Sequence, residues 1–178
     1  SHEALEAVAL ASSGYSDLEL DLDTGKRGSR QAYVARLLGQ LTAAQDAQVL
    51  VEWPGAQARV WRRRLYLMTP LAALPDWQAP WSGEPGVSTP LGPLQLRLEC
   101  DAYLAESFML RWRQGGEVLV LPGRGRRDLK RLLQERALPP WERERLIVVM
   151  AGERCLGVLQ PPAYVLWQAE GATFHREG

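Results

Sequence analysis

The chain has 178 residues, of which 46% are hydrophobic and 24% are charged, an ordinary balance for a folded protein that excludes wholesale disorder. Lysine and arginine together number 21, and aspartate and glutamate also number 21, so the formal net charge is zero. A zero total does not exclude a nucleic-acid partner, because the positions of the charges decide that question.

Residues 1–28 are predicted to form an acidic N-terminal arm. Six acidic residues in the first 24 positions meet no lysine or arginine. Leu18, Leu20 and Leu22 alternate with acidic residues, which favours a short edge strand, whereas the concentrated charge equally favours a poorly ordered arm. The sequence leaves both alternatives open.

Residues 29–69 are predicted to form a helix-plus-β-hairpin unit. Ser29 can cap a helix whose apolar residues recur at helical spacing to about residue 44. The strand Val49–Trp53 follows, Pro54–Gly55 makes a turn, and a second extended segment runs over Ala58–Met68. Strict alternation along that segment leaves neither face cleanly apolar, which predicts a bulge or an edge position. Its arginines are Arg59, Arg62, Arg63 and Arg64.

Residues 70–93 are predicted to be a Pro-rich linker between two domains. Six prolines fall in this stretch, which excludes a helix or a central strand. Trp77 and Trp81 indicate that part of the linker packs against a neighbouring domain.

Residues 94–170 are predicted to form a second domain in which strands come first, two helices follow and further strands end the domain. Residues 171–178 are predicted to be a frayed tail. The irregular mixture of strands and helices predicts an α+β fold with two small domains. A helix should begin at Asp128, and Pro139–Pro140 should end it and start a short second helix. The expected strands are Leu94–Leu98, Phe108–Trp112, Glu117–Leu121, Leu146–Met150, Arg154–Gln160 and Ala163–Trp167.

A basic segment joins the expected strand at Leu121 to the helix after it. Between Pro122 and Arg145 there are eight basic and four acidic residues, in a chain whose net charge is zero. Gly123 and Gly125 allow close approach of a ligand to the backbone, and the start of a helix favours anions. The pattern fits phosphate contacts, and it equally fits a solvated charged surface.

Histidines and cysteines offer no site for catalysis or metal binding. His2 and His175 lie near the ends, where a formed pocket is not expected, so nucleophilic catalysis with a histidine base is disfavoured. Cys100 and Cys155 form no Cys-x-x-Cys pair, which predicts reduced thiols. The chain has no apolar run near the roughly 18–20 residues of a membrane span and no signal-peptide pattern. We therefore expect no membrane partner and a cytoplasmic location.

Two blocks of the sequence carry a family resemblance. The block Leu129–Arg143 contains Pro139-Pro140-Trp141 after a Leu-Lys-Arg helix, and it resembles the signature of the C-terminal domain of tRNA(Ile)-lysidine synthetases. Asp46–Gly55 followed by Arg62–Met68 resembles the family's middle, substrate-recognising domain. The family's N-terminal ATP-pyrophosphatase domain has no counterpart in the chain.

The resemblance implies that the parent enzyme uses ATP to attach lysine to the wobble cytidine of tRNA(Ile). This chain would then be its non-catalytic, tRNA-contacting C-terminal portion, inactive alone and without a cofactor of its own. ATP and Mg²⁺ would belong to the missing catalytic domain, which would be a partner together with tRNA(Ile). The expected nucleic-acid-binding residues are Arg124, Arg126, Arg127, Lys130, Arg131 and Arg143, with Arg62, Arg63 and Arg64 as secondary candidates.

Two further functions remain as alternatives. The same basic helix could dock an acidic protein partner in a structural or interaction module. A self-contained enzyme is disfavoured, because the chain has neither an internal histidine nor an intact phosphate-binding loop.

Overall fold

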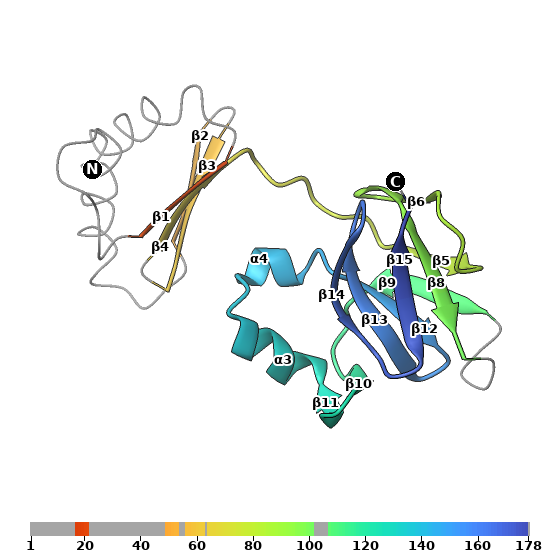
Figure 1. The fold of residues 1–178 in the computed structure, drawn as a ribbon. Helices are drawn as coiled ribbons and strands as arrows, with labels where there is room; N and C mark the ends of the chain where they lie inside the picture. The colour runs from red at the N-terminus through yellow and green to blue at the C-terminus, as the bar shows by residue number, and fades with distance from the viewer. Residues whose placement is uncertain (1–16, 22–48, 54–55, 63, 102–106, 178) are drawn as a thin grey trace. The chain divides into compact units, whose positions relative to one another are not determined.

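A computed structural model describes residues 17–21, 49–53, 56–62, 64–101 and 107–177 (Figure 1). The chain divides into two compact units, Ser1–Ala73 and Leu74–Gly178.

The described part of the first unit is a four-stranded antiparallel sheet in the order β1-β4-β3-β2. Its strands are β1 (Asp17–Asp21), β2 (Val49–Trp53), β3 (Ala56–Trp61) and β4 (Arg64–Met68). Of the two alternatives for the acidic segment, the edge strand is the one found over Asp17–Asp21. The expected helix after Ser29 lies outside the described residues.

The extended segment predicted over Ala58–Met68 is wrong as a single strand, because it forms β3 and β4 of one hairpin. Trp61 and Arg64 pair directly, so the chain reverses between them. Arg62 has a φ of 48°, which a two-residue hairpin turn requires and which a non-glycine residue adopts at some cost in free energy.

This reversal resolves the mixed polarity that strict alternation predicted. Residues paired across antiparallel strands share a face of the sheet. The chain reversal after Trp61 therefore places apolar residues of β1, β3 and β4 on the same face of the sheet. The apolar pairs are Ala58 with Leu67, Val60 with Leu65, Leu18 with Leu67, and Leu20 with Leu65.

The second unit is built on a five-stranded antiparallel sheet in the order β14-β13-β12-β9-β5 (Figure 1). The strands are β5 (Gln78–Trp81), β9 (Phe108–Trp112), β12 (Ile147–Ala151), β13 (Arg154–Gln160) and β14 (Tyr164–Gln168). Strand β12 lies in the middle, and all five of its residues are buried.

Each face of this sheet is covered by another layer. On one face, β8 (Leu96–Cys100) pairs with β15 (Ala172–Arg176), next to the hairpin of β6 (Val87–Thr89) and β7 (Gly92–Leu94). Ile147, Val149 and Ala151 of β12 belong to the apolar cluster under this layer.

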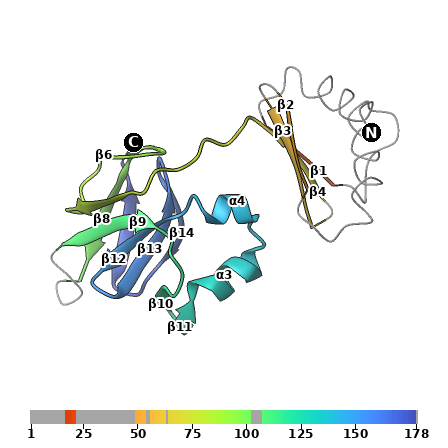
Figure 2. The same ribbon diagram turned by 180° about the vertical axis from the view of Figure 1, so that it is seen from behind.

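The other face is covered by a hairpin and two helices, and Figure 2 shows them in the view turned by 180°. The hairpin consists of β10 (Val118–Leu121) and β11 (Gly125–Asp128), and α3 (Leu129–Arg136) and α4 (Pro140–Arg143) follow it. The second apolar cluster lies here and includes Val148 and Met150 of β12. Alternate residues of β12 therefore contribute to two cores.

The predicted linker and tail both differ from the structure. Within residues 70–93, β5 and the β6–β7 hairpin belong to the second unit, which begins at Leu74. Strand β5 tolerates Pro80 because it is the edge of the sheet, where a missing N–H removes no ladder bond. The predicted frayed tail instead contains β15, paired with β8 in residues far away in the sequence. The described residues are thus mostly β-strand with few helices, so the predicted α+β class holds only in part.

Candidate nucleic-acid interface

The β10–β11 hairpin turns over Pro122–Arg124. The backbone N–H of Arg124 donates to the carbonyl of Leu121 at 3.1 Å, and Leu121 pairs with Gly125. Gly123 and Gly125 each have a φ of 70°, a conformation that glycine adopts without steric cost. Leu119 and Leu121 of β10 are buried, whereas all four residues of β11 are exposed. The hairpin therefore anchors one strand in the core and presents the other to solvent.

Helix α3 follows β11 directly. Its buried residues are Leu129, Leu132 and Leu133, which recur at helical spacing and belong to the second apolar cluster. Lys130 and Arg131 lie exposed in its first turn, which contains no acidic residue. Positive side chains at this end oppose the helix dipole, and a bound anion would offset that cost.

Five of the predicted cations lie together on this hairpin and first helical turn, and all five are exposed. Arg126 pairs with Val120, which is 48% exposed, so both residues share the face of the hairpin that points away from the core. Arg124 approaches Glu135 at 3.4 Å, and both side chains are about half exposed or more, so the pair is weak. Arg127 pairs with the buried Leu119, so it lies on the other face of the hairpin from Arg126, although its side chain is also exposed. We call the exposed cations of this hairpin and helical turn the basic face; it comprises Arg124, Arg126, Arg127, Lys130 and Arg131.

The other predicted cations lie elsewhere. Arg143 is only partly exposed, and its Nε donates to the carbonyl of Leu138 at 2.7 Å, so it braces α4. Arg62 belongs to the first unit, where its guanidinium lies 4.6 Å from the centre of the Trp61 ring. Arg64 begins β4, and Arg63 lies outside the described residues.

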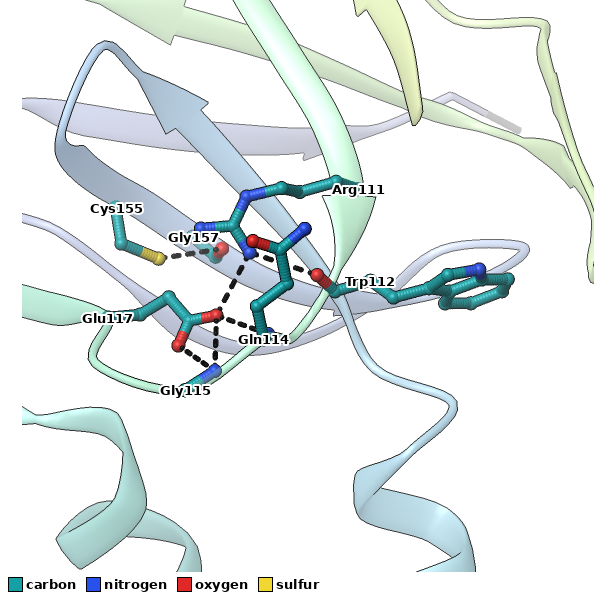
Figure 3. Close-up of polar contacts among 7 residues, drawn as sticks. All are labelled: Arg111, Trp112, Gln114, Gly115, Glu117, Cys155 and Gly157. Atoms are coloured by element: carbon teal, nitrogen blue, oxygen red, sulfur yellow. Dashed lines mark hydrogen bonds and ion pairs between the residues drawn. The ribbon is translucent and has the colours of Figure 1, made fainter. Parts of the chain in front are cut away.

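A buried carboxylate holds the base of the hairpin (Figure 3). Glu117 accepts the backbone N–H of Gln114 at 2.6 Å and that of Gly115 at 2.9 Å, and its side chain is 1% exposed. Arg111 of β9 donates from Nη1 to the same carboxylate at 3.0 Å. The backbone carbonyl of Glu117 accepts the N–H of Leu129, the first residue of α3, at 3.0 Å. One residue thus connects the β9–β10 turn, the sheet and the start of the basic helix.

Charge and hydrogen bonding keep Glu117 ionised. Burial alone would raise the pKa of its carboxyl group, but the backbone N–H groups of Gln114 and of Glu117 itself, together with the Arg111 guanidinium, outweigh burial and lower that pKa. Sequence reasoning assigned Glu117 only to a strand. The available signal was an acid directly after Gln114-Gly115-Gly116, where a turn leaves backbone N–H groups to be capped.

Cys155 lies beside this network and is inert. Its Sγ is 3.4 Å from the carbonyl oxygen of Gly157, and burial raises the pKa of its thiol to about 12 (Figure 3). A thiol with so high a pKa has almost no thiolate near neutral pH. Within the part of the chain that the structure describes, no cluster of three or more His, Cys, Asp or Glu could hold a metal ion, and no helix is long and apolar enough to cross a membrane.

Comparison with known families bears on the unit that carries the basic face. Residues 108–172 match the family model described as the TilS substrate C-terminal domain. This stretch of the chain is similar to that family's domain. It contains β9 to β14 with α3 and α4, and therefore the whole basic face. A model described as L-seryl-tRNA selenium transferase matches residues 1–58, most of which lie outside the described residues.

Curated relatives agree with the C-terminal match. The tRNA(Ile)-lysidine synthase of Xanthomonas campestris pv. campestris is 42% identical over 118 residues, which cover 65% of this chain and 27% of the relative. The enzyme of the same name from Xanthomonas axonopodis pv. citri is 45% identical over 117 residues, and that of Methylococcus capsulatus is 34% identical over 151 residues, or 33% of its length. The chain thus spans about a quarter to a third of these relatives, and the resemblance to tRNA(Ile)-lysidine synthetases is confirmed.

Proposed function

We propose that this chain binds tRNA through the basic face, as a non-catalytic C-terminal portion of a tRNA(Ile)-lysidine synthase. In this proposal its partners in the cytoplasm are tRNA(Ile) and the catalytic domain, and that domain binds ATP and Mg²⁺. The observation that carries the proposal is the gathering of five exposed cations on one hairpin and helical turn within the matched family domain.

The chemistry of the basic face suits a phosphate backbone. Four of its five cations are arginines, whose planar guanidinium groups form paired hydrogen bonds to phosphate oxygens. The glycines at the turn leave the backbone accessible, since a side-chain carbon placed at Gly123 or Gly125 would meet no atom within 4 Å. Such contacts fix the position of an RNA without reading its sequence. A positioning role is what a non-catalytic domain can contribute to a distant reaction.

Charge also predicts the salt dependence of binding. Each neutralised phosphate steepens the slope of log affinity against log salt by about 0.9 on a duplex. Five contacts would give a slope of about −4.5, and affinity would fall roughly 500-fold between 50 and 200 mM salt. Removal of three cations should make the slope shallower by about 2.7.

The test is fluorescence anisotropy of labelled tRNA(Ile) titrated with the full chain at several salt concentrations. The first variant combines Arg126→Gln, Lys130→Gln and Arg131→Gln. Its matched control changes the net charge equally on strands outside the basic face. The control substitutions are Arg97→Gln, Arg154→Gln and Arg176→Gln.

We expect the first variant to lose affinity and salt dependence with an unchanged thermal midpoint, and the control to stay within about threefold of the parent. Equal losses of affinity in both variants would show that only the net charge of the chain matters, and the basic face would no longer be a binding site. Saturable binding to a polyaspartate competitor without binding to tRNA would instead favour the alternative of an acidic protein partner.

A further inference from the structure

An exposed aromatic ring lies at the C-terminal end of α3. Tyr164, the first residue of β14, is 50% exposed, and among the described residues it and Val120 are the large hydrophobic side chains with substantial exposure. A tyrosine exposed to this extent contributes little to a core. Its ring is nevertheless in contact with a specific neighbour, Arg136.

Arg136, the last residue of α3, holds the tyrosine ring in place. Its Nη2 donates to the Tyr164 hydroxyl, and its Nη1 donates to the carbonyl of Leu166 at 3.4 Å. The guanidinium carbon lies 5.9 Å from the centre of the Tyr164 ring and 5.4 Å from that of the partly buried Trp167 ring. These contacts fix the orientation of an exposed ring before any ligand arrives, so little conformational entropy remains to be lost on binding.

Tyr164 lies at the end of α3 opposite to the basic face. Arg131 and Arg136 are on the same helix, and five residues correspond to about 8 Å along its axis and about 140° around it, so an RNA that contacts both residues has to pass around the helix. Both arginines are exposed. Proteins bind single-stranded nucleotides by combining aromatic rings, on which bases stack, with positive charges that hold the phosphates.

We propose that Tyr164, oriented by Arg136, is a stacking platform for an unpaired base of the RNA whose phosphates lie on the basic face. This inference rests on the proposed RNA binding and adds a preference for RNA with unpaired nucleotides. Every base has a π face, so the platform selects for an unstacked nucleotide and tolerates any base identity. Alanine substitution at stacking aromatics weakens binding by about 5- to 150-fold.

A purely structural role for Tyr164 makes a different prediction. If the ring only shields Arg136 and fastens the end of α3, loss of the ring lowers the thermal midpoint and weakens every RNA equally. Tyr164→Phe keeps the ring and loses the hydroxyl bond to Arg136. Tyr164→Leu keeps apolar bulk over Arg136 and loses the π face. The two variants therefore separate stacking from shielding.

The experiment measures binding of the full chain to two labelled RNAs by anisotropy at one salt concentration. One is a blunt RNA duplex, and the other is the same duplex with a single-stranded 3′ extension of four nucleotides. The proteins are the parent, Tyr164→Ala, Tyr164→Leu, Tyr164→Phe and the control Val120→Ala, which truncates the other exposed hydrophobic residue. Thermal midpoints are measured for all of them.

We expect the parent to prefer the extended RNA. Both Tyr164→Ala and Tyr164→Leu should lose about 5- to 150-fold in affinity for it, while their affinity for the blunt duplex should change less than twofold. Tyr164→Phe and Val120→Ala should stay within threefold of the parent. Parent-like binding by Tyr164→Leu, or equal losses on both RNAs, would overturn the platform while the proposed RNA binding stands. A parent that binds neither RNA nor tRNA(Ile) would overturn both.

Discussion

Replacement of Glu117 by glutamine should destabilise the second unit, because this buried side chain accepts bonds from two backbone N–H groups and from a guanidinium. Its carboxylate accepts N–H bonds from Gln114 and Gly115 and the charged bond from Arg111, whose side chain is 17% exposed. Glutamine retains one acceptor oxygen but places an NH₂ group against these donors. Removal of one partner of a buried ion pair costs about 3–5 kcal/mol, and the retained oxygen puts Glu117→Gln near 3 kcal/mol.

The opening of this unit can be followed through Cys155. A Cys100→Ser background leaves Cys155 as the single thiol, and labelling with an aromatic disulfide at pH 7.5 then reports its exposure. When labelling is limited by the population of the open state, a loss of 3 kcal/mol raises the rate about 150-fold. A labelling rate within fivefold of the parent would refute the assignment of Glu117 as the anchor of the hairpin.

A double substitution and a pH series test the physical cause. Arg111→Met combined with Glu117→Gln removes the unpaired guanidinium, so its cost should fall short of the sum of the single changes by about 1.5–3 kcal/mol. The pKa of Glu117 is lower in the folded chain than its unfolded value of about 4.3, so its contribution is complete above that value and is lost as pH falls through the folded pKa. The difference between parent and Glu117→Gln should be constant from pH 6 to 8 and shrink below about pH 4.3, whereas a pH-independent difference would contradict an electrostatic origin.

Three further predictions concern the cores. In the native parent, the partly exposed Cys100 should react with the thiol reagent at least tenfold faster than the buried Cys155, and equal reaction rates would contradict the burial of Cys155. The free energy of unfolding should also decline as pH rises from about 9 towards 12, because the Cys155 thiol ionises in that range only in the unfolded chain. Gly157→Ala should destabilise the chain by about 1–3 kcal/mol in urea denaturation, since the added carbon would lie 2.5 Å from Cζ of Phe174; a neutral effect would show that the ring moves aside freely. Trp141→Ala should cost about 3–5 kcal/mol in the same assay, since the side chain is 7% exposed, and a parent-like midpoint would mean that this residue is no core anchor.

Sequence patterns predicted the second unit best where an element had local signals. Buried leucines at helical spacing marked α3, and Pro140 in its first turn marked α4. Strands β9 and β12 were indicated by alternation and by an apolar run. The five cations of the basic face lie on one hairpin and helical turn because they are close in sequence, and their contact with nucleic acid stays a prediction.

Elements that depend on distant partners were not predictable in this way. Strand β15 has the polar sequence of a tail and becomes a strand by pairing with β8, more than 70 residues earlier. Pro80 marked a linker, yet β5 tolerates it at the edge of the sheet. Arg62 gave no signal of a turn, since glycine or asparagine is usual at a positive φ. Arg126 and Arg127 were expected in a loop, but their pairing with β10 makes them a strand.

Strand β12 couples the layer that contains α3 to the layer on the opposite side of the sheet. Neighbouring residues of this strand point into different cores, so the layer of α3 and the layer of β8 and β15 cannot separate from it one at a time without exposing apolar surface. Amide hydrogens of Ile147–Ala151 should therefore exchange only when the whole unit opens. In the proposed complex, a change of shape on binding would therefore have to come mainly from the RNA.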